Sequence, residues 1–509
     1  MPEPRLLHHL VDHAADRDGN APAVTHGGVT LTYRELAAAS LRLARWLADR
    51  GLQRGDRIAV AAASSAYLPA LIYGASRTGV VFTLLHEQVH GTVLEHILDD
   101  CEPAMLVSDD PRAARPASLR GISVVGTSDV IAAAVGAGTA AGPSAAEQQT
   151  GLPREPLQVD AVCLVYTSGS TSLPKAVVTT HQQAVFVAQA IHAELAYQPD
   201  DTVYCPLPLS FDYGLYQLFI SSLGGSHVWL GAAAEAGPSL LANLNRARAT
   251  VLPAVPAIAE ALARLLTRNP AAVPPLRLLT NTGAAMPGEP IAELRRLIPA
   301  LRIQLMFGLT ECKRVSIMPP DEDLRRPGAC GRPLPGTEVF VVDSEGKRLR
   351  PGETGEFVVR GPHVMAGYWR RADDERFRRA DGLFPQLHTG DHGWLDEDGY
   401  LYFVGRRDDI YKERGFRVSA TEVEAAARRV NGVREAAVLP PAGCRPRAVL
   451  FAVTALAADE VLRALRHELE DYKIPPRCVV LGALPLTGNG KVDKKVLAAR
   501  VDRELADAH

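Results

Sequence analysis

The sequence has no run of about 20 apolar residues, so a membrane-spanning helix is not expected. It also has no Cys-x-x-Cys pair and no marked excess of either charge. Its first residues, MPEPRLLHHLVDHAADRDG, lack the apolar core of a signal peptide, which favours a cytoplasmic protein. The seven cysteines are an odd, scattered set, and neither a disulfide framework nor a structural zinc site is expected. Lys and Arg number 55 against 58 Asp and Glu, a balance that does not favour nucleic acid or a membrane surface as partner.

What the chain does contain is the composition of a globular protein, with 47% hydrophobic and 22% charged residues. Its 509 residues exceed the roughly 100–200 of one domain, so two or more domains are expected. Short apolar strands alternate with amphipathic helical segments over most of the length, which predicts an α/β fold with much parallel sheet. From residue 333 onward, short strands with Gly- and Asp-rich turns predict an antiparallel β region.

The change of texture along the chain predicts two domains. Residues 1–405 are expected to form a large N-terminal domain of layered α/β subdomains plus the β region. Residues 406–509 are expected to form a small, mobile α+β domain. The Ala/Gly/Ser-rich stretch from about 131 to 151 is typical of a mobile connector or surface loop.

The segment with the most chemical information is YTSGSTSLPKAV, residues 166–177, which follows the apolar strand AVCLV. A strand that ends in a Ser/Thr/Gly-rich turn with a lysine offers N–H groups, hydroxyls and one cation to a polyphosphate. It is not a Walker A loop, because Pro174 precedes Lys175 and Ala176 follows it. Taken alone, such a segment is also compatible with a polar surface turn without function.

The same string closely resembles the phosphate-loop signature of the adenylate-forming superfamily, which comprises acyl-CoA synthetases, nonribosomal peptide adenylation domains and firefly luciferase. Other segments resemble further motifs of that family, in the family's order: FGLTEC at 307–312, HTGDHGWLDEDGYLYFVGRRDD at 388–409, KERGFRVSATEVE at 412–424 and LPLTGNGKVDKK at 484–495. Five motifs in register across nearly the full chain leave little room for chance. In appearance the chain is nearest to free-standing amino-acid adenylation enzymes.

The resemblance implies a ligase that uses ATP and Mg²⁺ to convert a carboxylate into an acyl-AMP with release of pyrophosphate. Charge that develops on the phosphates needs cations and N–H donors positioned in advance. Catalytic roles are implied for Thr310, Glu311 and Lys491, with Glu311 as the hard oxygen ligand that Mg²⁺ prefers. The resemblance implies nucleotide-binding roles for Thr167, Ser168, Gly169, Ser170, Thr171, Lys175, Gly283, Ala284, Ala285, Phe307, Gly308, Asp391, Arg406 and Arg417.

Some of these residues have ordinary alternatives when taken singly. Asp391 in a Thr-Gly-Asp triplet would usually be a turn residue, and Lys491 would usually be a solvated lysine. Because both residues occur within the ordered set of motifs, a functional role is favoured for each of them. The phosphate loop departs from the family at Ser172 and Ala176, where glycine is usual, yet every polar group needed for chemistry remains. The family rotates its small domain between two half-reactions, which implies a hinge at Asp408.

The family begins its acyl pocket at the place where this chain has PLPLSFDYGLYQLF, residues 206–219. The Phe-Asp pair of this segment resembles that of amino-acid adenylation domains, whose aspartate holds the substrate ammonium. The alternative is that Asp212 only caps the helix that follows. The substrate is therefore expected to be an amino or imino acid. The residues expected around it are Asp212, Tyr213, Tyr216, Val255, Asn281, Thr282, Lys313 and Arg314, and the two cations alternatively pair with the acids of PPDED at 319–323.

No carrier-protein signature follows Lys491, so the acyl group is expected to pass to a separate acceptor. The resemblance favours the phosphopantetheine thiol of a separate carrier protein in a pathway such as nonribosomal peptide or antibiotic biosynthesis. The alternative is an AMP-forming acyl-CoA ligase that uses coenzyme A and a non-amino carboxylic acid. A third reading is a catalytically silent paralogue, against which stand the retained Lys175, Glu311, Asp391 and Lys491. His181 and His227, in or beside apolar stretches, are interpreted as structural.

Overall fold

The structure is a computed structural model of the whole chain. It describes residues 3–87, 89–136, 154–167, 174–371, 374–378, 385–406, 409–413, 416–442, 445, 447–469, 471–487 and 491–506. The chain divides into two compact units. Unit 1 consists of residues 1–327, 331–338 and 360–387, and unit 2 consists of residues 328–330, 339–359 and 388–509. The boundary predicted after residue 405 stays a prediction.

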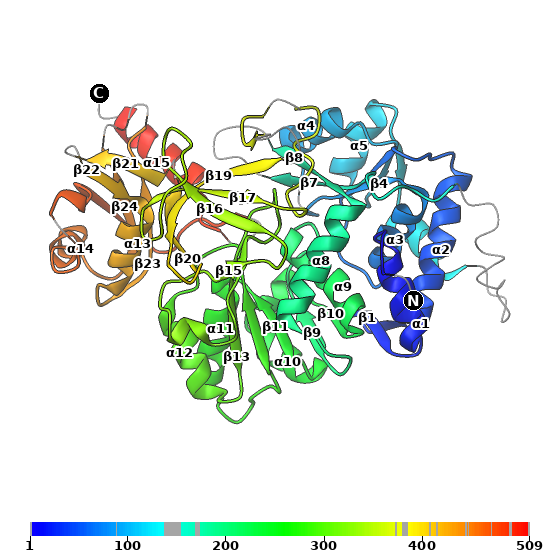
Figure 1. The fold of residues 1–509 in the computed structure, drawn as a ribbon, viewed down its shortest axis with the longest axis horizontal. Coiled ribbons are helices and arrows are strands. Elements are labelled where there is room, and N and C mark those ends of the chain that lie inside the picture. The colour runs from blue at the N-terminus through cyan, green and yellow to red at the C-terminus, as the bar shows by residue number, and fades with distance from the viewer. Residues whose placement is uncertain are drawn as a thin grey trace. The chain divides into compact units, whose positions relative to one another are not determined.

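A nine-stranded sheet forms the centre of unit 1 (Figure 1). Its strands, in spatial order, are β15 (Arg332–Pro333), β14 (Ser316–Ile317), β13 (Arg302–Phe307), β12 (Leu278–Asn281), β11 (Val251–Ala254), β9 (Thr202–Cys205), β10 (His227–Leu230), β1 (Pro22–His26) and β2 (Val29–Thr32). From β13 to β1 all neighbours are parallel, and the antiparallel pairs lie at the two edges. Parallel neighbours place their carboxyl ends at one edge of the sheet, where α/β proteins bind ligands.

A second, six-stranded sheet of unit 1 carries the predicted phosphate loop. Its order is β6 (Ser123–Val125), β5 (Met105–Val107), β3 (Arg57–Val60), β4 (Val81–Leu84), β7 (Ala161–Thr167) and β8 (Lys175–Thr180). All pairs are parallel except β7 with β8, which form an antiparallel hairpin. Thr167 pairs with Lys175 across this hairpin, so both ends of the phosphate loop are held by backbone hydrogen bonds.

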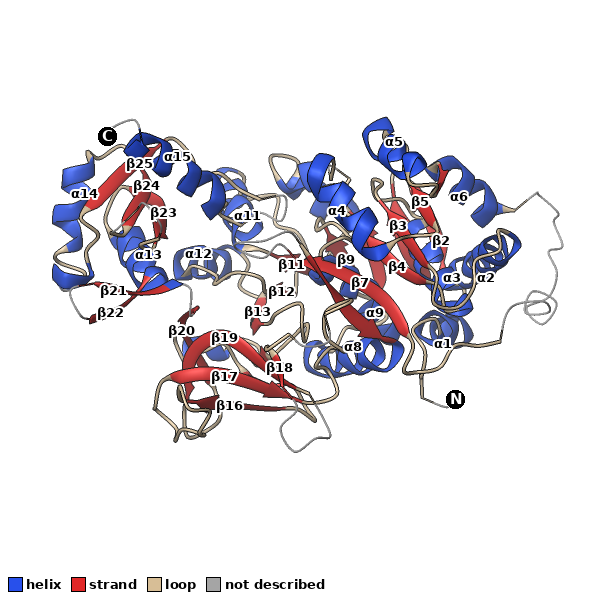
Figure 2. Ribbon diagram, turned by 90° about the horizontal axis from the view of Figure 1, so that it is seen from above, coloured by secondary structure: helices blue, strands red, loops and turns tan. Residues whose placement is uncertain are grey.

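The helices of unit 1 bury apolar residues between and around the two sheets (Figure 2). The sequence explains their starts, as in α2, where Thr32 and Glu35 form a reciprocal capping box. These helices are α1 (His9–Asp18), α2 (Tyr33–Asp49), α3 (Leu68–Thr78), α4 (Gly91–Cys101), α5 (Pro111–Leu119), α6 (Thr127–Val135), α8 (His181–Leu195), α9 (Asp212–Gly224), α10 (Leu240–Ala247), α11 (Pro256–Arg268) and α12 (Gly288–Leu297).

A five-stranded sheet includes most of the β region predicted after residue 333. Its strands run in the order β16 (Glu338–Val342), β17 (Gly355–Arg360), β19 (Gln386–Leu395) and β18 (Phe377–Arg378), and β20 (Leu401–Arg406) also pairs with β19. The β18–β19 and β19–β20 pairs are antiparallel, as predicted.

The C-terminal part of unit 2 is a small α+β body with its own cores (Figure 2). Its central sheet pairs β23 (Val433–Leu439) antiparallel and β25 (Arg477–Leu481) parallel with β24 (Val449–Thr454). The short strands β21 (Ile410–Glu413) and β22 (Phe416–Ser419) form a hairpin. The helices are α13 (Ala420–Arg429), α14 (Ala458–Leu465) and α15 (Lys494–Ala506).

The predicted α/β fold, with a large N-terminal part and a smaller α+β part at the C-terminus, is confirmed. The expected connector from about 131 to 151 is wrong at its start, because residues 131–135 form the last turns of α6. Val130 and Ala134 of that helix are buried, so apolar burial outweighs the small-residue composition there. Residues 137–151 lie outside the described part. Among the described residues, no helix is long and apolar enough to cross a membrane.

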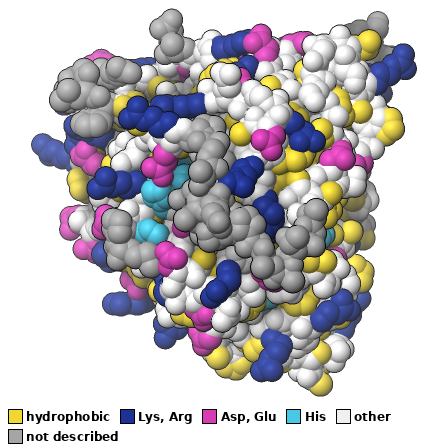
Figure 3. All heavy atoms as spheres, turned by 90° about the vertical axis from the view of Figure 1, so that its right-hand side faces the viewer, with side chains coloured by type: hydrophobic (Ala, Val, Ile, Leu, Met, Phe, Trp, Pro, Cys, Tyr) yellow, Lys and Arg dark blue, Asp and Glu magenta, His cyan; other side chains and the backbone are white. Residues whose placement is uncertain are grey.

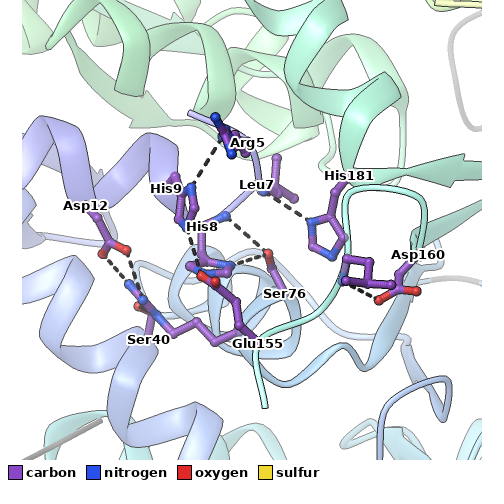
Figure 4. Close-up of polar contacts among 12 residues, drawn as sticks. Arg5, Leu7, His8, His9, Asp12, Ser40, Ser76, Glu155, Asp160 and His181 are labelled. Carbon is purple, nitrogen blue, oxygen red and sulfur yellow. Dashed lines mark hydrogen bonds and ion pairs between the residues drawn. The ribbon is translucent and has the colours of Figure 1, made fainter. Parts of the chain in front are cut away.

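Helix α1 is attached to unit 1 by a cluster of polar contacts (Figure 4). The backbone N–H of Arg5 donates to Nδ1 of His9, so the proton of His9 lies on Nε2, which donates to Glu155 at 3.0 Å. Nδ1 of His8 lies 3.0 Å from the hydroxyl of Ser76, and burial lowers the pKa of His8 to about 4. Because these ring nitrogens are engaged within the chain, we interpret the cluster as structural.

The two histidines predicted to be structural have contacts that fit this interpretation. Nδ1 of the buried His181 accepts a hydrogen bond of 3.2 Å from the backbone N–H of Leu7 (Figure 4). Nε2 of His227 lies 2.7 Å from the hydroxyl of Thr25. On the face of the molecule shown in Figure 3, basic and acidic side chains are interspersed, and no large field of one sign covers its described atoms.

Candidate functional site

The predicted acid-pocket residues gather at the carboxyl edge of the nine-stranded sheet. Strands β11, β12 and β13 lie side by side and parallel (Figure 1). Val255 directly follows β11, Asn281 ends β12 and Thr282 follows it, and the side chains of Asn281 and Thr282 are buried. The amide of Asn281 donates to the carbonyl of Ala254 at 3.1 Å, which ties the two strand ends together. The structure thus places these residues in one neighbourhood, and their role toward a substrate stays a prediction.

Helix α9 begins at this same edge and contributes Asp212, Tyr213 and Tyr216. Asp212 is the first residue of α9, and the N-cap is Phe211 without a side-chain hydrogen bond, so Asp212 does not act as the cap. Its side chain is only 7% exposed, and no described residue donates a hydrogen bond to its carboxylate. The hydroxyl of Tyr213 lies 2.7 Å from that of Thr280 in β12, which fixes α9 against the sheet.

One cavity borders Asp212, and a second, larger cavity shares part of its lining. The smaller, of about 10 Å³, is lined by Asp212 together with Leu164, Leu209 and Ser210, and it holds about one water molecule. The larger, of about 130 Å³, shares Leu209 and Ser210 with the smaller and extends to Ala62 and His86. An acid that reaches Asp212 therefore needs side chains of the smaller cavity to move.

Glu311, the predicted magnesium ligand, lies in the turn after β13 and is 5% exposed. Its Oε1 accepts hydrogen bonds from the hydroxyl of Tyr368 and from the Arg376 guanidinium, the latter at 2.8 Å. Burial raises the pKa of Tyr368 well above its usual range, so its hydroxyl stays protonated. Two donors thus hold one oxygen of a buried carboxylate. Thr310, beside it, is half-buried.

Lys175, the predicted phosphate-loop cation, also contacts the segment of unit 1 that contains Tyr368 and Asp374. Its ammonium forms an ion pair of 2.9 Å with Asp374 and lies 5.0 Å from the centre of the Tyr368 ring. The backbone of this segment runs beside β8, because the N–H of Trp369 donates to the carbonyl of Ala176 at 2.8 Å. One segment therefore contacts both the predicted phosphate-loop lysine and the predicted magnesium ligand.

The predicted adenine-binding positions lie in two loops. Gly283 has a φ of 89°, which favours glycine, and the exposed Ala284 and Ala285 follow it before α12. Phe307 ends β13, and a Cβ at the next residue, Gly308, would lie 2.2 Å from the carbonyl of Lys313. The turn from 307 to 315 therefore closes tightly only because Gly308 has no side chain.

Unit 2 holds the remaining predicted nucleotide contacts. Asp391 in β19 is 1% exposed and pairs in register with Arg406 in β20. Nε of Arg406 donates to Oδ1 of Asp391 at 3.0 Å. The Thr389 hydroxyl accepts from the N–H of Asp391, also at 3.0 Å, and Gly390 adopts a φ of 72°, which shapes the Thr-Gly-Asp turn. Two residues predicted to act together are thus adjacent, and their role toward ribose stays a prediction.

Lys491, also in unit 2, is exposed and sits in a turn whose ends are bonded. Its carbonyl accepts from the N–H of Thr487 at 2.7 Å, and Leu486 and Val492 form a β-bridge. Several predicted residues lie outside the described part of the structure: Ser168, Gly169, Ser170, Thr171 and Asp408. The backbone of Arg417 belongs to β22, and its side chain is not among those described.

Sequence reasoning missed the contribution of Tyr368, Asp374 and Arg376. Their segment, GYWRRADDERF at 367–377, combines three aromatic residues with a dense cluster of both charges. That mixture is unusual beside an apolar strand such as β8, and it is the signal that could have marked the segment. The partners of its charges, more than 60 residues away in the chain for Arg376 and Glu311, are visible only in the fold.

Known proteins resemble the chain over nearly its full length. A family model described as "AMP-binding enzyme" matches residues 11–369, and one described as "AMP-binding enzyme C-terminal domain" matches residues 422–491. The chain is 33% identical over 497 residues to the L-proline--[L-prolyl-carrier protein] ligase of Streptomyces coelicolor, and the match covers 92% of each protein.

Solved structures agree with these matches. VinN in complex with L-aspartate has 37% sequence identity and a TM-score of 0.70, and the match covers 79% of this chain and 98% of that one. The o-succinylbenzoate coenzyme A synthetase MenE from Bacillus subtilis, in complex with ATP and magnesium ion, has 25% identity and a TM-score of 0.80. That match covers 95% of this chain and 98% of MenE. The predicted family is confirmed: the chain belongs to the AMP-binding enzyme family, within the adenylate-forming superfamily, and is an AMP-forming ligase.

Proposed function

We propose that this ligase activates an amino or imino acid with ATP and Mg²⁺ and passes it to the phosphopantetheine thiol of a separate carrier protein. The observation that carries the amino-acid part is the carboxylate of Asp212, which is buried at the predicted acid pocket and accepts no hydrogen bond from the described residues. A buried carboxylate without a partner is costly, and a substrate ammonium would supply a charge-assisted hydrogen bond. A helix cap would not leave it in this state.

The ATP-binding part of the proposal rests on Lys175, Glu311 and the hairpin that carries the phosphate loop. Glu311 fits a magnesium ligand, because it is a buried hard-oxygen donor beside the sheet edge where ligands bind. Bound Mg²⁺ would neutralise charge on the phosphates. When ATP binds, Lys175 would break its ion pair with Asp374 and bind a phosphate oxygen. The ion pair between Arg376 and Glu311 would weaken as Glu311 binds the metal. Lys491 supplies a mobile cation for the reacting carboxylate, and Asp391 an acceptor for the ribose hydroxyls.

The carrier protein as acceptor is supported by a relative, since a protein 33% identical over nearly the whole chain is named a prolyl-carrier protein ligase. VinN, solved with L-aspartate, supports an amine-bearing substrate. The second candidate is an acyl-CoA ligase for a non-amino acid, supported by the likeness to the coenzyme A synthetase MenE. A silent paralogue, the third reading, is disfavoured because Lys175, Glu311, Asp391 and Lys491 are all present.

The test is ATP–pyrophosphate exchange with acids offered in pairs, each with and without its amine. We expect the aminated member of the best pair to exceed its partner by about 100-fold in kcat/KM, because the amine-free acid leaves Asp212 unpaired. Asp212→Asn should remove most of this preference and leave the KM for ATP unchanged. Asp49→Asn, an exposed aspartate at the end of α2, is the matched control. Preference for the amine-free member of every pair would favour the acyl-CoA ligase instead.

The acceptor is tested separately with the acid that exchanges best. The enzyme is incubated with ATP, that acid and either a holo-carrier protein or coenzyme A, and the thioester is measured by mass spectrometry. We expect the carrier to be loaded at least about tenfold faster than coenzyme A. Faster formation of the acyl-CoA would reject the carrier as acceptor and leave the adenylation step as proposed.

A further inference from the structure

Two buried cations next to Glu311 form no ion pair with the part of the chain that the structure describes. Lys313 is 1% exposed and Arg314 is 3% exposed. Within the described part of the chain, Nζ of Lys313 and Nε of Arg314 have no hydrogen-bond partner. Among the described residues, the one side-chain hydrogen bond of this pair runs from Nη1 of Arg314 to the carbonyl of Lys313, at 2.8 Å. A carbonyl does not neutralise a guanidinium, and neither cation forms an ion pair with a described residue.

The acids of residues 321–323 do not supply the missing charge. The alternative drawn from the sequence was that Lys313 and Arg314 pair with the acids of residues 321–323. The structure contradicts it, because Asp321 and Asp323 both pair with Arg295, at 2.9 and 2.7 Å. The third acid of that stretch, Glu322, lies 3.5 Å from Arg326.

The backbone at Lys313 adopts a strained conformation. Lys313 has a φ of 63°, in the left-handed region that residues with a Cβ rarely adopt. Such a conformation costs of order 1–3 kcal/mol and persists where the surrounding structure demands it. The same turn closes tightly at Gly308, and it carries a buried lysine whose Nζ has no hydrogen-bond partner among the described residues.

Both cations face helix α9, whose first residue is Asp212. The guanidinium carbon of Arg314 lies 4.9 Å from the centre of the Tyr213 ring. Nζ of Lys313 lies 6.0 Å from the centre of the Tyr216 ring, and the buried hydroxyl of Tyr216 also lacks a hydrogen-bond partner among the described residues. The first turn of α9 therefore carries the carboxylate of Asp212, and two cations that form no ion pair with the described residues lie against the aromatic rings of the same helix.

We infer that Lys313 and Arg314 bind a second acidic group of the substrate, so that the enzyme's amino acid is dicarboxylic. This rests on the proposed function, in which Asp212 binds the ammonium and one carboxylate is joined to AMP. Leaving a buried cation unpaired is strongly unfavourable, and a carboxylate that accepts charge-assisted hydrogen bonds from both cations removes that cost. The Tyr216 hydroxyl provides a further donor for the same group.

The phosphates of ATP are the competing anion, and the contacts separate the two. Lys175 and Glu311, the predicted phosphate and magnesium residues, both contact the segment that contains Tyr368. Lys313 and Arg314 contact the aromatic residues of α9 instead. Their neighbours are therefore those of the acid pocket.

The experiment compares charged substrates with neutral isosteres in ATP–pyrophosphate exchange on the wild-type protein. The panel is aspartate, asparagine, isoasparagine, glutamate, glutamine, alanine, β-alanine and proline. We expect aspartate or glutamate to exceed its amides in the panel, and also alanine, β-alanine and proline, by about 100-fold in kcat/KM. Of the two aspartate amides, the one that retains the better activity shows which carboxylate is activated. A neutral amino acid as the best substrate would overturn the inference and leave the proposed function intact.

Variants then assign the effect to the cation. Lys313→Met, of similar length without charge, should lower kcat/KM for the dicarboxylic acid at least about tenfold and raise it for the corresponding amide. Lys313→Arg should retain part of the preference, and the exposed Lys347→Met should behave as wild type. Thermal unfolding confirms that each variant folds. An equal or larger rise in the KM for ATP in Lys313→Met would overturn the inference in favour of phosphate binding.

The two proposals fail in different ways. If only amine-free acids support exchange, the proposed amino-acid function fails, and succinate is then compared with succinamic acid. Preference for succinate would keep the assignment of Lys313 and Arg314 to a second acidic group. Preference for succinamic acid would overturn it.

Discussion

Glu311, Lys313 and Arg314 lie in one turn, yet their charges differ in whether the described chain supplies an oppositely charged partner. The carboxylate of Glu311 receives the hydroxyl of Tyr368 and the guanidinium of Arg376 from another part of unit 1. The two cations that follow it are as deeply buried and receive no anion from the described chain. On the proposed assignment, the residues for nucleotide and metal are held by partners that a ligand can displace, whereas the two cations assigned to the acid form no ion pair with the described residues.

The largest effect expected from this comparison is that of Glu311→Gln. The variant keeps the shape of the side chain and loses the charge that a magnesium ion requires. Pyrophosphate exchange should fall by about 100- to 1,000-fold, and the remaining activity should need more Mg²⁺. The measurement is exchange rate against Mg²⁺ concentration. An unchanged Mg²⁺ dependence would remove Glu311 from the metal site.

A smaller effect is expected when the internal partner of Glu311 is removed. Arg376→Gln frees the carboxylate from a guanidinium 2.8 Å away, so less Mg²⁺ should be needed for the same rate. We expect the half-maximal Mg²⁺ concentration to fall about three- to tenfold, the size of one partly exposed ion pair. Arg378→Gln, two residues along and bonded to a backbone carbonyl, is the control. A higher Mg²⁺ requirement in Arg376→Gln would mean that Arg376 positions Glu311 rather than competing for it.

The smallest effect concerns a buried titratable group that needs no ligand. Burial lowers the pKa of His181 from its ordinary 6.5 to about 3. Below about pH 6.5 the imidazole of His181 binds a proton in the unfolded chain but stays neutral in the folded one. Its contribution to the free energy of unfolding is therefore fully present above that pH and is lost as the pH drops toward 3. The loss from this residue between pH 6.5 and 5 is about 2 kcal/mol.

His181→Asn keeps an acceptor for the backbone N–H of Leu7 and removes the titration. The difference in urea-unfolding free energy between pH 7.5 and pH 5 should therefore shrink by about 2 kcal/mol relative to wild type. His467→Gln, an exposed histidine, should leave that difference as it is. If this difference in unfolding free energy is the same in His181→Asn as in the wild type, His181 binds its proton in the folded protein as readily as in the unfolded chain.

The parts of this molecule that the sequence predicted are those determined by local pattern. Alternating apolar segments predicted the α/β layers, and the strand before the phosphate loop is β7. The family was predicted because Lys175, Glu311, Asp391 and Lys491 occur in short motifs whose spacing along the chain can be read directly. Residues 131–135 were assigned to a connector because Ala-rich composition does not show that one face of a helix is buried.

The parts that were not predicted depend on contacts between distant segments. Arg376 and Asp374 reach Glu311 and Lys175 only because the segment before them pairs with β8. The choice between cap and ammonium site at Asp212 required the start of α9 and the absence of a cap hydrogen bond. The missing partners of Lys313 and Arg314 became visible only after Arg295 was found to pair with Asp321 and Asp323.

The most direct test of the account is a crystal structure with the amino acid that exchanges best and a non-hydrolysable ATP analogue. We predict the ammonium of the substrate on Asp212, and Nζ of Lys313 at about 2.7–3.2 Å from an oxygen of the acidic group that is not activated. Lys313 bound to a phosphate oxygen, or still without an anion while the acid is in place, would contradict the account.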